Sequence, residues 1–162
     1  IYEDEKYQIL DNLMVFPRTY IVSRYKVIND KEKAIEEIYK EETSLRDEVI
    51  LSEEPKLNIE HDENPQVSLV SYSSNLIRIV ALTNKDGILV LTDPFYPGWK
   101  SFIDSKETKI LRANHAFRAI ELPAGKHDVT FVYSPESVKV GFILAIVGIF
   151  GLLLFRPLIK KI

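Results

Sequence analysis

The chain contains no cysteine and only one tryptophan, Trp99, among its 162 residues. Without cysteine it can form neither a disulfide framework nor a thiolate metal site. Glycine-rich phosphate-binding loops are absent, and no serine, histidine and carboxylate have the spacing of a nucleophile, a base and an orienting acid. We therefore expect no catalytic residue, no metal site and no cofactor in this chain.

Acidic residues are missing from the last part of the chain, because none of the 24 aspartates and glutamates follows Glu136. Residues 1–136 combine 17 basic with 24 acidic residues, a net charge of −7, whereas the remainder carries four basic residues. Proteins that bind nucleic acid present a basic surface to the phosphates. The acidic main body therefore argues against nucleic acid as a partner.

Charges are also absent from Val140 to Phe155, a run of sixteen residues. With its flanks the run extends over residues 137–159, which as a helix reaches roughly 34 Å at 1.5 Å per residue. That length crosses a hydrocarbon core of about 30 Å. A buried core helix is the alternative, but the rest of the chain is too small to cover such a helix on every side. The sequence predicts a transmembrane helix at 137–159.

The flanks of this segment predict its orientation. Arg156, Lys160 and Lys161 cluster after it, while the preceding region is acidic. The positive-inside rule then makes residues 160–162 a short cytoplasmic tail and residues 1–136 an extracytoplasmic domain of the cell membrane. The chain starts with Ile1 and shows no signal-peptide pattern, so we expect a piece of a longer protein.

Residues 1–136 contain one stretch with the period of a helix and many runs that are typical of strands. Residues 18–28 predict a strand, and residues 29–40 predict a short amphipathic helix with Asn29 and Glu32 as a capping box. Further strands are expected at 47–54, 67–72, 75–82, 88–93, 99–104, 108–114, 117–122 and 126–133. We therefore predict a mainly β fold, an antiparallel β-sandwich or jelly roll with one short N-terminal helix, in which 88–93 is a central strand.

Aromatic residues gather around the turn Pro97-Gly98, where Phe95, Tyr96 and Trp99 lie within five positions. Flat aromatic rings can stack on a glycan, and Tyr96 at the turn itself is the best candidate for this. The alternative is a structural corner, in which the tryptophan is buried under the loop that it follows. We favour the corner for Trp99.

Four polar residues surround the connection before the strand at 117–122: Arg112, Asn114, His115 and Arg118. Two arginines in one loop could bind phosphate or a lipid headgroup. Alternatively, Arg118 forms an ion pair with Glu121 or Asp104 and only holds the loop, which is the interpretation that we favour.

Two histidines need separate consideration. His61 stands among Glu60, Asp62 and Glu63, but consecutive loop residues do not converge on one metal ion, so we expect no metal there. His127 follows a glycine turn, and we expect a structural hydrogen bond from it.

The stretch from Gly87 to Pro135 resembles the C-terminal extracytoplasmic region of the YfhO family of polytopic membrane proteins. The residues that carry the resemblance are Tyr96-Pro97-Gly98-Trp99, Asp104, Arg112-Ala113-Asn114, Phe117-Arg118, Leu122 to His127, Tyr133 and Pro135, with Phe16-Pro17-Arg18 near the start. Ser105 departs from the pattern, because the family usually has glycine there.

The resemblance implies a relation to GT-C-type glycosyltransferases, which use polyprenyl-phosphate sugars. Their catalytic carboxylate is expected on an early outer loop among upstream membrane helices, which this chain does not contain. The resemblance thus implies an inactive fragment, an accessory domain that positions an acceptor glycan or the lipid-linked donor beside those helices. A free-standing, membrane-anchored β-sandwich that binds a glycan or a partner protein is one alternative, and a structural lid without a ligand is another.

Overall fold

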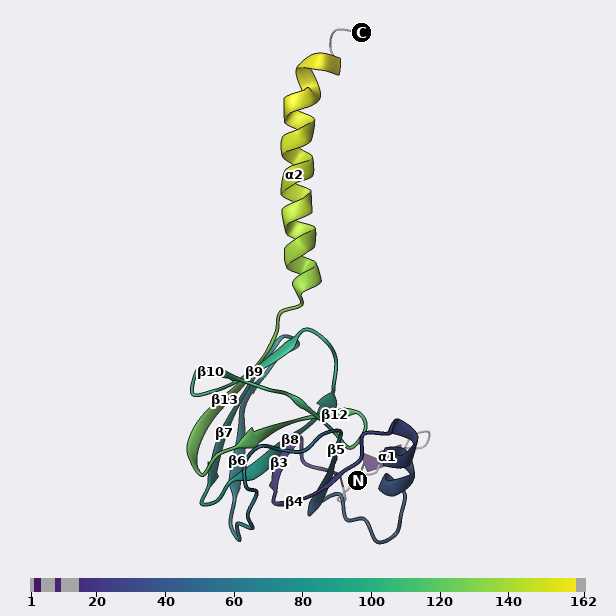
Figure 1. The fold of residues 1–162 in the computed structure, drawn as a ribbon, viewed down its shortest axis with the longest axis vertical. Coiled ribbons are helices and arrows are strands. Elements are labelled where there is room, and N and C mark those ends of the chain that lie inside the picture. Colours follow the sequence, from purple (N-terminus) through teal and green to yellow (C-terminus); the bar gives the residue numbers. More distant parts are fainter. Residues whose placement is uncertain (1, 4–7, 10–14, 160–162) are drawn as a thin grey trace.

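The structure, a computed structural model, describes residues 2–3, 8–9 and 15–159, and the side chains of residues 15–150. The predicted cytoplasmic tail, residues 160–162, lies outside the described residues. Two helices and thirteen strands are described (Figure 1): β1 Tyr2–Glu3, β2 Gln8–Ile9, β3 Thr19–Val22, β4 Arg24–Val27, α1 Lys31–Ile38, β5 Glu48–Leu51, β6 Gln66–Tyr72, β7 Leu76–Thr83, β8 Gly87–Pro94, β9 Trp99–Ile103, β10 Lys106–Thr108, β11 Leu111–Ala113, β12 Phe117–Leu122, β13 Gly125–Tyr133 and α2 Glu136–Ile159.

The strands form two large sheets, and the prediction of a mainly β, antiparallel-rich fold is confirmed. One sheet has the order β10-β9-β13-β7-β6, and the other has the order β3-β8-β12-β11-β5-β4. Among the described strands only β4 and β5 pair in parallel. The predicted central strand is also confirmed, because β8 lies between β3 and β12 and is buried from Gly87 to Leu91.

Two segments predicted as single strands are each divided between two strands. The segment 18–28 bends at Ser23, so that β3 and β4 lie at opposite edges of the six-stranded sheet. Since one residue separates them, the sheet must curl until its two edges approach each other. The segment 108–114 leaves one sheet after β10 and enters the other at β11.

This curl gives the six-stranded sheet two buried faces. Its inner face holds a cluster that includes Val49, Val90 and Ala119. On its outer face, Leu89 and other residues of β8 and β12 pack against residues of the five-stranded sheet such as Phe131. Burial on both faces explains why β8 reads as a continuous apolar run and not as an alternating one.

The N-cap of helix α1 lies one residue later than the sequence predicts. Asp30, not Asn29, is the N-cap, because its extended backbone lets its carboxylate accept a hydrogen bond from the Lys33 N–H at 2.9 Å. Of its apolar residues only Ala34 is buried, and Tyr39 beyond its end is 83% exposed.

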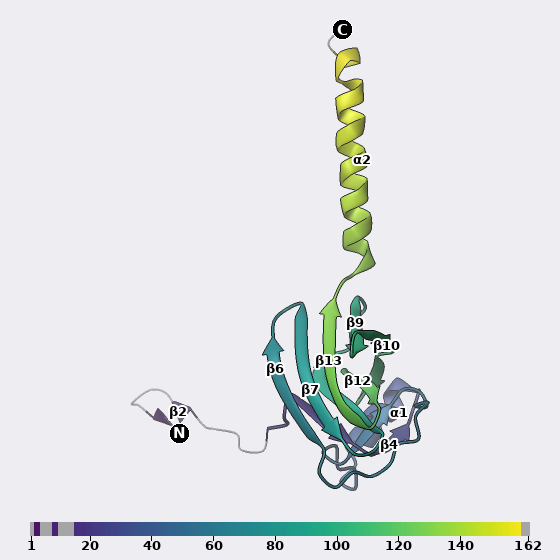
Figure 2. The ribbon, with the colours of Figure 1, turned by 90° about the vertical axis from the view of Figure 1, so that its left-hand side faces the viewer.

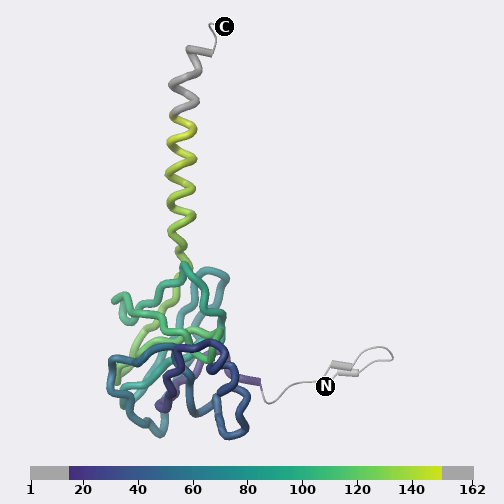
Figure 3. The backbone as a smooth tube through the Cα atoms, turned by 45° about the vertical axis from the view of Figure 1, so that its right-hand side comes forward, coloured from purple at the N-terminus to yellow at the C-terminus, as the bar shows by residue number. Residues whose placement is uncertain are grey.

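Helix α2 follows β13 after Ser134 and Pro135 and points away from the sheets in all three views (Figures 1–3). Apolar side chains on its described part, such as Phe142 at 67% and Phe150 at 63%, are exposed. Among the described residues no helix is both long and apolar enough to cross a membrane, so the span at 137–159 stays a prediction.

The hairpin between β9 and β10 turns at Asp104 and Ser105, one residue earlier than the predicted turn at Ser105-Lys106. Both residues have positive φ, 48° and 71°, and Lys106 already pairs with Ile103. Two consecutive positive φ values are typical of a type I′ turn, which favours glycine at its second position. This geometry explains why glycine would suit the position of Ser105.

Replacing Ser105 by glycine should therefore stabilise the protein. Glycine adopts a φ of 71° without the steric cost that a Cβ brings, so we expect Ser105→Gly to raise the free energy of unfolding by about 0.5–1 kcal/mol. Urea unfolding measures the change. Ser74→Gly, in the turn after β6 at a residue without positive φ, is the matched control and should bring no gain. Equal effects of both substitutions would contradict this account of the turn.

Candidate functional site

A buried ion pair joins β8 to β12 at the end of the sheets from which α2 leaves. Arg118 is 2% exposed, and its Nη2 donates to Oδ2 of Asp93 at 2.9 Å. The register shifts between Phe117, opposite Pro94, and Arg118, opposite Leu91. This bulge brings Asp93 beside the arginine, since the two are not direct partners in the ladder.

The carboxylate of Asp93 is shared with two further side chains. Its Oδ1 accepts hydrogen bonds from Nη1 of Arg18 at 2.9 Å and from the hydroxyl of Tyr72 at 3.3 Å. The guanidinium of Arg18 also lies 4.7 Å from the centre of the Tyr72 ring. Because Tyr72 belongs to the five-stranded sheet and Asp93 to the other, this cluster ties the two sheets together. It contains two guanidinium groups and one carboxylate.

Trp99 covers the buried arginine. The Cζ of Arg118 lies 3.9 Å from the centre of the Trp99 ring, and Trp99 also contacts Tyr133 with ring centres 5.4 Å apart. Gly98 makes this possible with a φ of +99°, and a Cβ there would come within 2.9 Å of Tyr133 and Pro135. One face of Trp99 is thus occupied by the guanidinium, as expected of a structural corner.

The predicted ion pair of Arg118 exists, but its predicted partners were wrong. Asp93 holds the guanidinium, whereas Glu121 accepts hydrogen bonds from backbone N–H groups of the loop after β5, each at 2.7 Å. Asp104 lies 2.6 Å from Nδ1 of His127, which confirms the structural hydrogen bond expected of that histidine. Burial lowers the pKa of Arg118, and the charge of Asp93 opposes this shift.

Two adjoining hollows open at this end of the β-domain, by which we mean residues 15–135 before α2, and together we call them the aromatic cleft. The first, of about 310 Å³, is lined by Tyr72, Ser74, Asp93, Pro94, Tyr96, Trp99, Arg118 and Tyr133. The second, of about 480 Å³, shares Tyr96, Trp99 and Tyr133 with the first and extends to residues 134–137, where α2 begins. Tyr96 is 62% exposed and forms part of both walls. Figure 2 shows this end of the sheets below α2.

The structure divides the six predicted ligand-binding residues into two groups. Tyr96, Trp99 and Arg118 line the aromatic cleft. The other three lie outside it: Arg112 packs over the Phe95 ring at 5.0 Å, and Asn114 and His115 form the turn before β12 with positive φ. The amide oxygen of Asn114 accepts a hydrogen bond from the Ile50 N–H at 2.9 Å, so this turn is fastened to β5.

Sequence reasoning missed four residues of the cleft and its cluster: Arg18, Tyr72, Asp93 and Tyr133. A signal existed for Asp93, because an acidic residue at the end of a fully buried strand needs a cationic partner. Arg18 and Tyr133 were noticed only as residues that carry the family resemblance.

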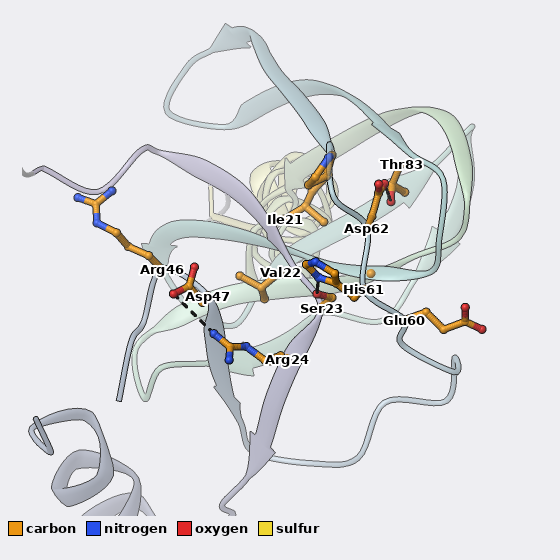
Figure 4. Close-up of a pocket in the computed structure, with 12 residues that line it drawn as sticks. Ile21, Val22, Ser23, Arg24, Arg46, Asp47, Glu60, His61, Asp62 and Thr83 are labelled. Atoms are coloured by element: carbon orange, nitrogen blue, oxygen red, sulfur yellow. Dashed lines mark hydrogen bonds and ion pairs between the residues drawn. The ribbon is translucent and has the colours of Figure 1, made fainter. Parts of the chain in front are cut away.

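A second pocket, of about 470 Å³, lies at the end of the β-domain opposite α2 (Figure 4), and its lining includes Ser23, Arg24, Arg46, Asp47, Glu60, His61, Asp62 and Thr83. His61 lies 3.0 Å from the hydroxyl of Ser23. The acidic groups already have partners, since Glu60 pairs with Lys85 and Asp62 accepts from Thr83 and Asn84. Within the described residues no group of histidines and carboxylates could hold a metal ion.

The residues that line the cleft lie in the part of the chain that matches a known protein family. Residues 49–145 match the family model described as bacterial membrane protein YfhO, which is more than half of the chain. A curated relative, the uncharacterized protein YfhO of Bacillus subtilis (strain 168), is 25% identical over 80 residues. That match covers 49% of this chain and 9% of the relative, so the chain spans a small part of the relative's length. No solved structure matches.

The buried ion pair should be essential for stability. Asp93→Asn keeps the shape of the side chain but leaves the charge of Arg118 buried without a carboxylate, which we expect to lower the free energy of unfolding by about 3–5 kcal/mol. Urea unfolding followed by Trp99 fluorescence measures the loss. Glu60→Gln, in the exposed pair with Lys85, is the matched control and should cost less than about 1 kcal/mol. A loss for Asp93→Asn no larger than that of the control would show that the pair is dispensable.

Stability should also depend on pH through Asp62. Hydrogen bonds from the backbone N–H groups of Asn84 and Asn64 lower the pKa of Asp62 to about 2. Because the unfolded value is about 4, the stabilisation is fully present above pH ~4 and is lost as the pH falls towards 2. Urea unfolding midpoints of Asp62→Asn should therefore vary less with pH in this window than those of the parent. The same pH dependence in both proteins would refute the assignment.

Proposed function

The chain belongs to the YfhO family of bacterial membrane proteins, and from this membership we propose that its β-domain is a non-catalytic, extracytoplasmic part of a polytopic membrane glycosyltransferase. The enzyme would use polyprenyl-phosphate sugars, and its catalytic carboxylate would lie on an upstream outer loop. The β-domain would position the acceptor glycan or the lipid-linked donor beside that loop.

The proposal places residues 137–159 in the bilayer, next to other membrane helices of the same protein. The uncharged run from Val140 to Phe155 supports this placement, as do the exposed apolar side chains on the described part of α2. Exposing such side chains to water is unfavourable in free energy, whereas placing them in hydrocarbon or against neighbouring helices is favourable. The basic residues after the run support a cytoplasmic C-terminus and an outer β-domain.

The observation that carries the proposal is the position of the aromatic cleft. It opens beside the first residues of α2, so a β-domain mounted on a membrane helix would hold Tyr96 at the membrane surface. Tyrosine and tryptophan suit this interface, because their rings are apolar and their polar atoms can reach water. A polyprenyl-phosphate sugar exposes its phosphate and sugar at the same level, within reach of an exposed ring.

The test is sugar transfer by the full-length protein in membranes. A stacking contact is worth about 0.5–1.5 kcal/mol, so Tyr96→Ala should lower kcat/KM for a polyprenyl-phosphate donor or for the acceptor by roughly 2- to 10-fold. Tyr39→Ala is the matched control, because Tyr39 is 83% exposed but belongs to the α1 region. An unchanged kcat/KM for Tyr96→Ala would show that the ring of Tyr96 in the cleft has no part in sugar transfer. Glycan binding by the 162-residue chain, without transfer by the full-length protein, would favour an anchored binding module instead.

A further inference from the structure

Arg118 has unused hydrogen-bonding capacity at the floor of the aromatic cleft. It is 2% exposed and lines the first hollow, yet its Nε and Nη1 have no partner within the described part of the chain. Trp99 and Phe131 lie against the guanidinium, with ring centres 3.9 and 5.5 Å from Cζ, and neither ring supplies an oxygen acceptor. A buried donor left unpaired costs free energy, and more so when the group is charged. An acceptor that enters the cleft would recover this free energy.

The charge of the site selects an anion as that acceptor. Asp93 is the only acidic residue that lines the first hollow, and its carboxylate is divided between Arg118 and Arg18. Two guanidinium groups and one carboxylate leave an excess of one positive charge beside the cleft. Arg118 itself is buried, so its attraction for an anion is stronger than that of an arginine on an open surface.

The neutral groups of the walls narrow the class of anion. The hydroxyl-bearing residues Ser74, Tyr96 and Tyr133 line the first hollow and can donate hydrogen bonds, whereas the hydroxyl of Tyr72 already donates to Asp93. A phosphate group offers several oxygen acceptors to guanidinium and hydroxyl donors at once, which is why arginine is frequent in phosphate sites. The second hollow adds one cation and one anion next to this position, Lys100, which pairs with Glu107 at 3.4 Å, and Glu136 at the start of α2.

We propose that the aromatic cleft binds a phosphate group, held by Arg118 and by hydroxyl groups of the walls. Arg18, which does not line the cleft but bonds to Asp93 and Tyr72 of its lining, adds positive charge beside the phosphate. The chemistry is common to an anionic lipid headgroup, a lipid-linked sugar phosphate and free inorganic phosphate. The lipid sources rest on the proposed function, which puts the cleft at the membrane surface, whereas the phosphate chemistry rests on the cleft alone.

Trp99, the only tryptophan of the chain, reports on the site directly, because its ring lies on Arg118. The 162-residue chain in phosphatidylcholine nanodiscs would be titrated with inorganic phosphate, and Trp99 fluorescence would be followed. A parallel series would use nanodiscs with increasing phosphatidic acid, whose headgroup is a phosphate monoester. We expect a saturable change in at least one series: a response to phosphatidic acid identifies a lipid source, and a response to inorganic phosphate alone identifies the free anion.

The matched variants are Arg18→Gln and Arg78→Gln. Arg18 is half exposed, so its replacement leaves the buried pair of Asp93 and Arg118 in place, and we expect at least a tenfold weaker apparent affinity. Arg78 is an exposed arginine of β7 that belongs neither to the lining of the cleft nor to the Asp93 cluster, and its replacement should leave the affinity unchanged. Tyr133→Phe, which removes one hydroxyl of the wall and keeps the ring that packs on Trp99, should weaken binding by a smaller factor.

The proposal is overturned if Trp99 fluorescence responds to neither probe, or if Arg18→Gln and Arg78→Gln respond alike. These outcomes are separate from a failure of the proposed function. Tyr96→Ala could still lower sugar transfer in a protein whose β-domain has no phosphate site. Conversely, a phosphate site could exist in a protein that transfers no sugar.

Discussion

The carboxylate of Asp93 holds one end of this β-domain together. It accepts hydrogen bonds from Arg118 of β12, Arg18 before β3 and Tyr72 of β6, and therefore joins both sheets where their shared apolar core ends. Trp99 closes the cluster by lying on the guanidinium of Arg118. A buried pair of this kind adds little net stability over an apolar pair of the same shape, but loss of one partner is costly. Its value here is that it fixes where four separate segments meet.

The cluster matters for function because of where it lies in the β-domain. The aromatic cleft lies between the cluster and the start of α2, so the end of the β-domain that the cluster holds together is also the end nearest the proposed membrane. The opposite pocket differs in kind, because its carboxylates Glu60 and Asp62 are already paired within the described residues. A site with unpaired donors and a floor held by the Asp93 cluster is the better candidate for a ligand.

Much of the fold could be predicted from the sequence, because strand alternation and turn residues are local signals. The central place of β8 follows from its continuous apolar run, and the burial of Phe131 follows from the alternation of its strand. The bend at Ser23 could not be predicted, since it depends on how far the six-stranded sheet curls. The N-cap was displaced from Asn29 to Asp30 because both residues can cap a helix and only the path of the backbone decides.

The candidate site could be predicted only in part, for a related reason. Tyr96 and Trp99 are conspicuous in the sequence because they flank a Pro-Gly turn, and Arg118 was named with its alternatives. Its partner Asp93 was not identified, because a bulge in β8, rather than spacing along the chain, brings the two together. Asn114 was named as a possible ligand-binding residue, but its amide oxygen is bonded to the backbone of β5.

The central claim is that the end of the β-domain with the aromatic cleft faces the membrane. Because the chain has no cysteine, one spin label can be placed at Tyr96→Cys and, in a second protein, at Glu63→Cys beside the opposite pocket. Electron paramagnetic resonance in nanodiscs would compare relaxation by lipid-soluble oxygen with relaxation by a water-soluble metal complex. We predict that the label at 96 responds mainly to oxygen and the label at 63 mainly to the metal complex. Equal, water-dominated relaxation at both positions would contradict the claim.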